Sequence, residues 1–361
     1  MTDMSLKVEP LPIVEPLIVR LRDAADELGV HDAVLIEVDG QRREYDFQGF
    51  SLALYADPDT RLDNDVILIA PGQTSARRLI RANSAHNTLL ITEQCDQLCL
   101  MCSQPPKKGH IDLFAELETA TLLAPANAYI GLSGGEPLLH KRKLFDMLLS
   151  LSIIRADLRF HILSNGQHFT DEDIETLQTI GTERILWGIP LYARDADRHD
   201  TIVAKQGAFE RLIESFAILF EAGALIELRT VVMQQNEAEL PAIADFVGTS
   251  LPFVERWAIM QLENIGYGRM NWDRSFKDTS TDFENVARAI NIATARNVPI
   301  QLYNFPLCSV PARYRGLAPA SIADWKKKHE SFCSGCSQRQ RCGGFFEWYD
   351  HKKGFRGLTP L

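Results

Sequence analysis

The chain has 361 residues, with 38 Lys and Arg against 48 Asp and Glu and a formal net charge of −10. Because a nucleic-acid surface needs excess positive charge, this balance excludes a nucleic-acid partner and favours a small or polypeptide substrate. The chain is 45% hydrophobic and 24% charged, which excludes disorder throughout. It has no run of about 20 apolar residues and no signal-peptide pattern at its start, so we expect a cytoplasmic protein with no membrane partner.

Residues 1–85 are expected to form a small accessory domain of the α+β class. An apolar-periodic helix is predicted over residues 16–28, and short strands are predicted over residues 33–38 and 65–69. Asp-Gly and Pro-Gly turn signals separate these segments.

From residue 86, short apolar runs alternate with segments of helical length, which is typical of a parallel sheet with helical crossovers. Strands are predicted at residues 88–92, 128–132, 159–163, 184–189, 226–232 and 254–260. Helices are predicted at residues 113–123, 138–151, 171–180, 209–222 and 237–247. Six strands predict an α/β fold, a partial (β/α)6 TIM-like barrel over residues 86–298. Ligands of such folds lie at the carboxyl ends of the strands, so we expect the functional residues in the loops that follow the strands.

Seven cysteines fall into two tight groups, with none before Cys95 and none between Cys102 and Cys308. This grouping argues against a scattered disulfide framework and favours metal sites. The second group lies in residues 299–361, where the strand and helix alternation is lost. We therefore expect a C-terminal domain that a metal orders more than a large core does.

The first group is a C-x3-C-x2-C run, Cys95, Cys99 and Cys102, directly after the first predicted strand of the sheet. Three thiolates at this spacing can hold a four-iron cube and leave one iron without a thiolate from the run. Such an open iron can bind a substrate or cofactor. Two alternatives stay open on spacing alone: a zinc site completed by a distant ligand such as His110, and three unconnected thiols.

A second motif, Gly134-Gly135-Glu136-Pro137, ends the second strand and opens the second helix. Paired glycines let the backbone approach a ligand closely, and the carboxylate can receive an ammonium group. Alone, this motif would be only a turn signal. Together with the cysteine run one strand earlier, it resembles the radical S-adenosylmethionine (SAM) superfamily.

This resemblance implies that Cys95, Cys99 and Cys102 hold a [4Fe-4S] cluster whose open iron binds the amino and carboxylate groups of SAM. Gly134 to Pro137 would cradle the methionine ammonium. An electron from a flavodoxin- or ferredoxin-type donor would then cleave the sulfonium homolytically, and the 5'-deoxyadenosyl radical would abstract a hydrogen atom.

Four further residues are predicted cofactor contacts by their position at strand ends. Ser164 and Asn165 close the third strand and offer a hydroxyl and an amide, although a plain turn is the alternative. Arg229 lies within an apolar run of the fifth strand, which predicts that it points into a polar barrel interior and, as in the superfamily, meets the cofactor carboxylate. Gln261 follows the sixth strand.

The loop after the fourth strand carries Asp197, His199 and Asp200. These side chains would contact a peptide or donate protons, or they simply form a hydrated polar loop. No catalytic residue is assigned from the sequence.

The second group consists of Cys308, Cys333, Cys336 and Cys342. Four thiolates can fully ligate a second [4Fe-4S] cube, and the spacing resembles the shorter, twitch type of the SPASM-like auxiliary-cluster extensions in radical enzymes that act on peptides. A structural zinc also fits the spacing. A redox pair at Cys333 and Cys336 is disfavoured because no strand and helix surround it.

Longer strings at residues 84–95, 99–106, 161–166, 188–192, 321–325 and 342–346 look like the C-type radical maturase family of the His-Xaa-Ser peptide-modification system. The likeness runs from about residue 60 to the end of the chain. It implies a ribosomally made precursor with His-Xaa-Ser repeats, processed beside a second radical maturase. Two alternatives remain: a radical enzyme that acts on a small metabolite, and a zinc-bound peptide-binding module.

Overall fold

The computed structural model describes residues 4–361. The chain divides into two compact units, each assembled from several segments. Unit 1 comprises residues 4–91, 111–133 and 140–161, and unit 2 comprises residues 92–110, 134–139 and 162–361. The predicted domain limits of 1–85, 86–298 and 299–361 stay a prediction.

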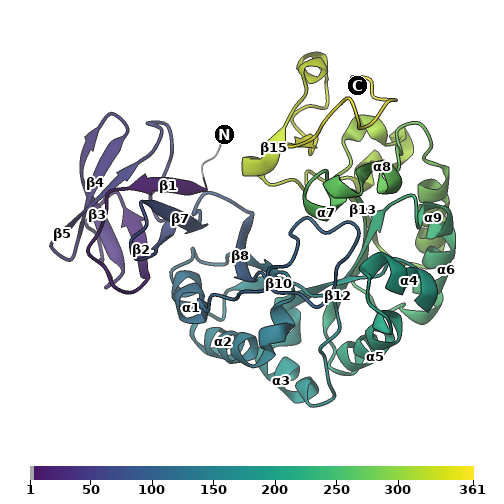
Figure 1. Cartoon of the computed structure of the whole chain (residues 1–361), viewed down its shortest axis with the longest axis horizontal. Helices are drawn as coiled ribbons and strands as arrows, with labels where there is room; N and C mark the ends of the chain where they lie inside the picture. Colours follow the sequence, from purple (N-terminus) through teal and green to yellow (C-terminus); the bar gives the residue numbers. More distant parts are fainter. Residues whose placement is uncertain (1–3) are drawn as a thin grey trace. The chain divides into compact units, whose positions relative to one another are not determined.

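The first seven strands form a closed barrel in the order β1-β5-β4-β3-β2-β6-β7 (Figure 1). Their bounds are β1 (Ser5–Val8), β2 (Leu17–Arg22), β3 (Asp32–Asp39), β4 (Arg42–Phe47), β5 (Phe50–Tyr55), β6 (Val66–Ile69) and β7 (Ser75–Ile80). Neighbouring strands are antiparallel except β2 and β3, which are parallel. Closure removes the free edges that an open sheet of this size would present.

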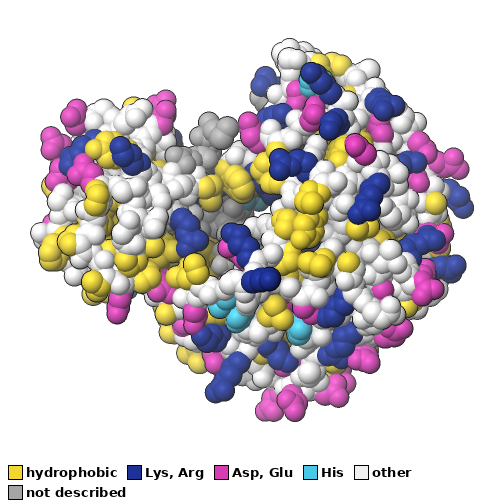
Figure 2. Space-filling view, in the orientation of Figure 1, with side chains coloured by type: hydrophobic (Ala, Val, Ile, Leu, Met, Phe, Trp, Pro, Cys, Tyr) yellow, Lys and Arg dark blue, Asp and Glu magenta, His cyan; other side chains and the backbone are white. Residues whose placement is uncertain are grey.

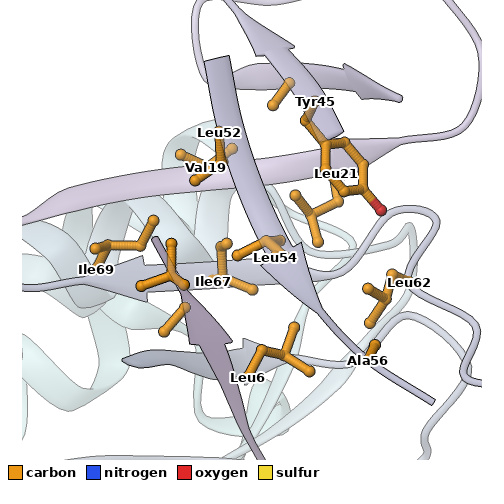
Figure 3. Packing of buried hydrophobic residues seen from close by; sticks show 13 residues of the cluster. Leu6, Val19, Leu21, Tyr45, Leu52, Leu54, Ala56, Leu62, Ile67 and Ile69 are labelled. Atoms are coloured by element: carbon orange, nitrogen blue, oxygen red, sulfur yellow. The ribbon is translucent and has the colours of Figure 1, made fainter. Parts of the chain in front are cut away.

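The barrel core follows from alternation along the strands. In β1, Leu6 and Val8 are buried whereas Ser5 and Lys7 are exposed, because successive side chains point to opposite faces. Inward-facing side chains of this kind from all seven strands make one apolar cluster (Figure 3): Leu6, Val8, Val19, Leu21, Ala33, Tyr45, Leu52, Leu54, Ile67, Ile69 and Ala76.

The predicted helix over residues 16–28 is wrong, since the segment forms strand β2, and the first helix of the described residues is α1. Ile18 and Val19 are β-branched and favour a strand, and β2 pairs with both β6 and β3. Arg20 Nε lies 2.6 Å from Asp32 Oδ1, whose side chain is fully buried. Barrel closure outweighs the helical periodicity, so this region is all-β and not α+β.

The second sheet has seven strands in the order β14-β13-β12-β11-β10-β9-β8. Their bounds are β8 (Asn87–Thr92), β9 (Tyr129–Gly134), β10 (Arg159–Leu163), β11 (Ile185–Pro190), β12 (Leu225–Val232), β13 (Arg256–Gln261) and β14 (Ile300–Tyr303). The pairs β11–β12, β12–β13 and β13–β14 are parallel. All six predicted strands are confirmed. The predicted number of strands in the sheet is wrong, because β14 adds a seventh. Strand β14 is only four residues long and includes polar Gln301, so its sequence pattern is weak.

The helices flank this sheet. Their bounds are α1 (Phe114–Leu122), α2 (Lys141–Ile154), α3 (Asp173–Ile180), α4 (Ala196–Val203), α5 (Ala208–Glu221), α6 (Leu240–Ser250), α7 (Gly266–Met270), α8 (Trp272–Ser275) and α9 (Glu284–Ala295). The five predicted helices are confirmed as α1, α2, α3, α5 and α6. Within unit 2, α5, α6 and α9 lie on the outer side of the strands (Figure 1).

Beyond β14 the chain forms short 3-10 turns and two-residue strands. The turns are η4 (Leu307–Ser309), η5 (Ala312–Leu317), η6 (Asp324–Lys326) and η7 (Ser331–Gly335), and the strands are β15 (Lys327–Lys328) and β16 (Phe345–Phe346). Cys333, Phe345 and Phe355 are the buried members of a small apolar cluster. The predicted loss of regular alternation is confirmed after Tyr303, but its predicted start at residue 299 is too early because β14 still belongs to the sheet.

On the face drawn in Figure 2, Lys and Arg side chains are interspersed with Asp and Glu. That distribution gives no broad basic field on this face. No helix within residues 4–361 is long and apolar enough to cross a membrane.

Candidate functional site

The loop of residues 95–102, which follows β8, lies against the end of helix α4. Leu98 N donates to Val203 O at 3.2 Å, and Leu100 N donates to Ile202 O at 2.9 Å. These main-chain bonds tie the cysteine loop to a helix that the sequence did not predict. Helix α4 begins at a regular cap, in which the Asp195 side chain accepts from Arg198 N at 3.0 Å.

The other end of the loop is held by α7. Tyr267 N donates to Cys102 O at 2.8 Å, and Asn271 Nδ2 donates to Leu100 O at 2.8 Å. Gly266, at the start of α7, has a φ of +57°, and a Cβ there would lie 2.5 Å from Cys102 O. Only glycine meets both requirements, so this residue fixes the approach of α7 to the cysteine loop.

The three cysteines of the loop are partly buried, and their thiols lie close enough to influence one another. Burial raises the pKa of Cys95 to about 11 and also raises the pKa of Cys99 and Cys102. The charge of Cys102 raises the pKa of both other thiols. A cationic group that receives all three sulfurs would reverse this effect, so the donor set fits an iron-sulfur cluster. Among the described residues, no three His, Cys, Asp or Glu side chains converge as a site for a single metal ion.

The two glycines of the Gly134–Pro137 motif are required by the backbone of the cysteine loop. Gly135 N donates to Thr92 O at 2.8 Å, and Glu136 N donates to Gln94 O at 2.7 Å. A Cβ on Gly134 would lie 2.3 Å from Thr92 O, and one on Gly135 would lie 2.1 Å from Gln94 O. The sequence analysis predicted that these glycines let the backbone approach a ligand. In the structure they let the glycine motif pack against the cysteine loop.

Glu136 is fully buried, with an exposed fraction of 0%. Its carboxylate accepts from Leu138 N at 2.8 Å, Ser164 Oγ at 2.9 Å and Asn165 N at 2.5 Å. Burial raises the pKa of Glu136 to about 7, although these bonds oppose the rise. The carboxylate therefore fastens the loop after β10 to the glycine motif. Contact with a cofactor ammonium stays a prediction, and it would use the remaining acceptor capacity of the carboxylate.

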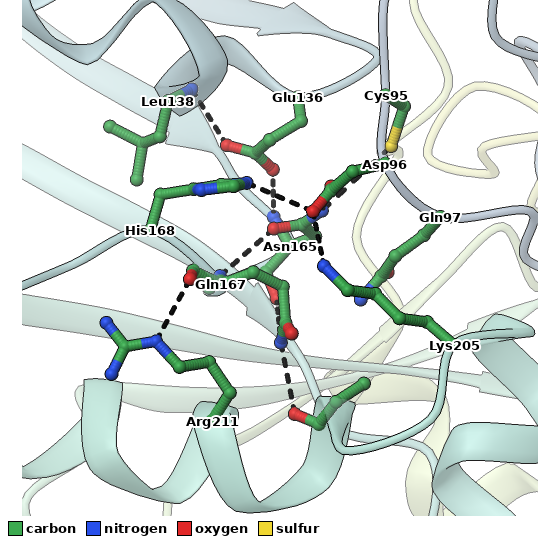
Figure 4. A network of polar contacts seen from close by, with 12 residues as sticks. Cys95, Asp96, Gln97, Glu136, Leu138, Asn165, Gln167, His168, Lys205 and Arg211 are labelled. Atoms are coloured by element: carbon green, nitrogen blue, oxygen red, sulfur yellow. Dashed lines mark hydrogen bonds and ion pairs between the residues drawn. The ribbon is translucent and has the colours of Figure 1, made fainter.

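An ionic network surrounds Asp96, next to the first cysteine (Figure 4). Asp96 accepts from Asn165 Nδ2 at 2.8 Å, lies 3.2 Å from His168 Nε2 and pairs with Lys205. Burial acts to raise the pKa of Asp96, but these three partners outweigh it and hold the pKa well below its usual range. The sequence analysis missed Asp96, His168 and Lys205 because they come from three separate loops.

Arg229 belongs to a charged cluster on one face of the sheet. It pairs with Glu227, which is fully buried and lies two positions away on β12. Glu227 also pairs with Arg256 Nε at 2.8 Å and accepts from the Tyr303 hydroxyl at 3.1 Å. The polar interior that was predicted around Arg229 is thus present, while the contact of Arg229 with a cofactor carboxylate stays a prediction.

The side chain of Gln261 is engaged within the protein. Its Nε2 donates to Lys277 O at 2.8 Å, and its Oε1 accepts from Thr279 Oγ1 at 3.4 Å. Because both ends of the amide have protein partners, a cofactor contact by this side chain would replace one of these bonds; it stays a prediction.

His199 and Asp200 have structural roles in the region that was interpreted as a polar loop. The Asp200 carboxylate accepts from Gly207 N at 2.6 Å and Phe209 N at 2.9 Å, at the start of α5. His199 is 1% exposed, and its Nδ1 accepts from Tyr192 N at 3.3 Å. Burial lowers the pKa of His199 to about 4. Both side chains are buried, so neither belongs to a hydrated polar loop, and a contact with a peptide stays a prediction.

Three buried polar atoms in loops that follow strands of the second sheet lack hydrogen-bond partners within residues 4–361: Gln97 Nε2 after β8, Gln235 Oε1 after β12 and Asn264 Oδ1 after β13. Buried polar groups without partners are rare in native proteins and often await a ligand. They lie in loops at the carboxyl ends of the strands, so they fit a polar cofactor.

The four terminal cysteines line one pocket with His329, Phe332 and Phe345. Cys342 Sγ accepts from Leu307 N at 3.4 Å and Gly344 N at 3.3 Å. Burial raises the pKa of Cys308 to about 12, and the neighbouring thiols contribute. The structure brings the four thiols into one pocket, while a metal bound by them stays a prediction.

The site thus combines an α/β sheet with two motifs, a three-cysteine loop after β8 and a glycine pair at the end of β9, which pack against each other. Residues 89–247 match the family model described as the radical SAM superfamily. This segment of the chain is therefore similar to the radical SAM superfamily.

Two curated relatives come from Bacillus subtilis strain 168. The sporulation killing factor maturation protein SkfB is 24% identical over 280 residues, which are 76% of this chain and 59% of the relative. The antilisterial bacteriocin subtilosin biosynthesis protein AlbA is 23% identical over 168 residues, 45% of this chain and 36% of the relative. The chain thus spans less than two thirds of the length of either relative.

A solved structure, Streptococcus suis SuiB bound to S-adenosylmethionine, is 15% identical with a TM-score of 0.49. The match covers 62% of this chain and 51% of SuiB.

Proposed function

We propose that the chain is a radical SAM enzyme that cleaves SAM reductively and modifies a ribosomally made precursor peptide of the His-Xaa-Ser type. The observation that carries this proposal is the packing of the Cys95–Cys102 loop against the Gly134–Pro137 motif within the radical SAM domain. Each motif is held by the other: Gly135 N and Glu136 N donate to the carbonyl groups just before Cys95.

Cys95, Cys99 and Cys102 would hold the first [4Fe-4S] cluster, with one iron open to SAM. When bound, this group supplies the electron that splits the sulfonium of SAM and so generates the radical that takes a hydrogen atom from the substrate. The chain's own residues position and enclose it. Asp96, Asn165 and Lys205 fix the cysteine loop, whose three cysteines are partly shielded from water.

The other proposed SAM contacts are Gly134 to Pro137, Ser164, Asn165, Arg229 and Gln261. Arg229 has the charge to bind a carboxylate, although Glu227 competes for it. Ser164 and Asn165 already serve Glu136. Their contribution is therefore to hold the cradle in shape and to offer their remaining donors to the cofactor.

A peptide substrate is supported by two independent features. The two relatives carry names that place them in the maturation of a killing factor and in the biosynthesis of a bacteriocin. The terminal pocket gathers four thiols, which suits a second, auxiliary [4Fe-4S] cluster with ligands from among Cys308, Cys333, Cys336 and Cys342. The proposed partners are the precursor, a flavodoxin- or ferredoxin-type electron donor and a second radical maturase.

The test uses protein purified anaerobically and supplied with iron, sulfide, SAM, a reductant and a His-Xaa-Ser precursor peptide. Chromatography follows 5'-deoxyadenosine, and mass spectrometry follows the peptide. We expect 5'-deoxyadenosine to form and the mass of the peptide to change in the same reaction. A Cys99→Ala variant in the same assay controls for non-enzymatic reaction.

Two results would contradict the proposal. A colourless protein with zinc in place of iron and sulfide would favour the zinc-bound peptide-binding module. Continued 5'-deoxyadenosine formation with an unchanged peptide would favour a small-metabolite substrate.

A further inference from the structure

His329 stands beside the sulfur-binding turn of the terminal segment. It follows β15, where Lys328 pairs with Phe345 of β16. A Cβ on Gly344, the residue just before β16, would lie 3.3 Å from His329 Nε2. The backbone N of this same Gly344 donates to Cys342 Sγ at 3.3 Å. The short ladder therefore fixes the imidazole next to Cys342.

The Nε2 atom of His329 is buried and has no hydrogen-bond partner in the part of the chain that the structure describes. In the neutral tautomer that carries its proton on Nδ1, Nε2 has a bare lone pair.

Neutral imidazole nitrogens are common metal ligands. His329 lines the same pocket as Cys308, Cys333, Cys336 and Cys342. The pocket therefore contains five ligating side chains, one more than a four-iron cube requires.

Among the four thiols, Cys336 is the one that burial and nearby contacts hold least firmly. Cys333 and Cys342 are buried, whereas Cys336 is partly exposed. Cys308 is also partly exposed, but it directly follows Leu307, whose backbone N donates to Cys342 Sγ at 3.4 Å. Cys336 is thus the thiol that the imidazole can most readily replace.

We propose that His329 Nε2 is a metal ligand of the terminal site, and that Cys308, Cys333, Cys342 and His329 together ligate its cluster while Cys336 is spare. The inference rests on the proposed function in one respect, namely that the terminal pocket holds an iron-sulfur cluster. It assigns to that pocket a mixed ligand set of three thiolates and one imidazole. Nitrogen ligation tends to make an iron-sulfur group easier to reduce than thiolate ligation alone.

The experiment combines metal analysis with pulsed electron paramagnetic resonance of the reduced, full-length protein, in a Cys99→Ala background that silences the first cluster. We expect a directly bonded nitrogen coupling in the remaining signal. His329→Ala removes that coupling, whereas His351→Ala, an exposed histidine of the same segment, leaves it unchanged. Cys336→Ala keeps the coupling and the iron content, whereas Cys342→Ala loses the iron.

The outcomes separate the two levels of the account. Zinc in place of iron in the terminal pocket of the wild-type protein would overturn both the second cluster and the ligand assignment. A terminal cluster without nitrogen coupling, or one that Cys336→Ala destroys as completely as Cys342→Ala does, would overturn only the role of His329.

Discussion

The two cysteine groups are held by different means. The loop of residues 95–102 lies between the ends of α4 and α7, bound by main-chain hydrogen bonds and by the Asp96 network. The terminal group lies on 3-10 turns and two-residue strands with a small apolar cluster beneath them.

The two cysteine groups therefore differ in how much of their geometry the protein itself fixes. Around the first group the protein fixes the geometry, and three thiols would leave one iron of a four-iron cube open. Around the second group there are more candidate ligands and less regular structure, so a bound metal would contribute more of the order. Variants in the first region should therefore alter cofactor chemistry, and variants in the second should alter local folding and peptide modification.

The largest effect is expected from Cys99→Ala. A cube that lacks one of its three thiolates loses the ligand geometry that leaves one iron open, so SAM cleavage should be abolished. The measurement is the rate of 5'-deoxyadenosine formation. If wild-type formation persists in this variant, the first group is not the SAM site and the comparison fails.

The next largest effect concerns the ionic network beside Cys95. Asp96→Asn and Lys205→Met should each weaken retention of the first cluster by about 10- to 100-fold, because these residues orient the loop that carries the ligands. Iron content after dilution into chelator measures this loss.

The matched control is Lys107→Met in the same loop region. Lys107 pairs with Glu93 at 2.7 Å, but its side chain is 66% exposed, and exposed pairs contribute at most about 1 kcal/mol. Equal iron loss in the control and the Lys205 variant would mean that the network has no special role.

A pair of glycine variants compares the packing of the two regions. Gly135→Ala places a Cβ 2.1 Å from Gln94 O, whereas a Cβ on Gly335 meets nothing within 4 Å. We expect Gly135→Ala to lower the free energy of unfolding by about 1 to 3 kcal/mol, as overpacking does. Gly335→Ala should stay within about 0.5 kcal/mol. Denaturant titration measures both, and equal effects would refute the close packing at the glycine motif.

The smallest predicted effect is a pH dependence from His199, which supports α4. Its pKa in the folded state is about 4, below the ordinary 6.5, so between these values the unfolded chain binds more protons. Stability therefore rises with pH in this window and is lost as the pH falls from 6.5 towards 4. Between pH 6.5 and 5 the loss is at most about 2 kcal/mol.

Denaturant titrations across this pH range would measure the slope. His199→Asn keeps an acceptor for Tyr192 N–H but has no titrating group, so it should flatten the slope. An unchanged slope in this variant would place the acid sensitivity at another group.

Much of the candidate site was predictable because both motifs follow strands of a parallel sheet. The carboxyl ends of such strands share one edge, so the Cys95–Cys102 run and the Gly134–Pro137 motif had to approach each other. Glu136 was also singled out, but its burial and its three protein donors were not predicted. They arise from the turn after β10, which the sequence does not reveal.

The remaining features depend on tertiary contacts. Asp96 and Lys205 are 109 residues apart, and nothing in either local sequence marks them as partners. The segment L-I-V-R-L-R of β2 satisfies both helical and strand patterns, and only barrel closure decides between them. His329 carries no spacing signal relative to the cysteines, and the pairing of β15 with β16 is what brings it beside Gly344.

The double variant Cys336→Ala with Cys342→Ala tests whether the two cysteine groups serve separate steps, SAM cleavage for the first and peptide modification for the second. Iron, 5'-deoxyadenosine and peptide mass are measured on one anaerobic preparation. We predict about half of the wild-type iron if both sites hold four-iron cubes, continued 5'-deoxyadenosine formation and no peptide modification. Peptide modification at the wild-type rate, or loss of SAM cleavage together with the terminal cluster, would contradict the claim.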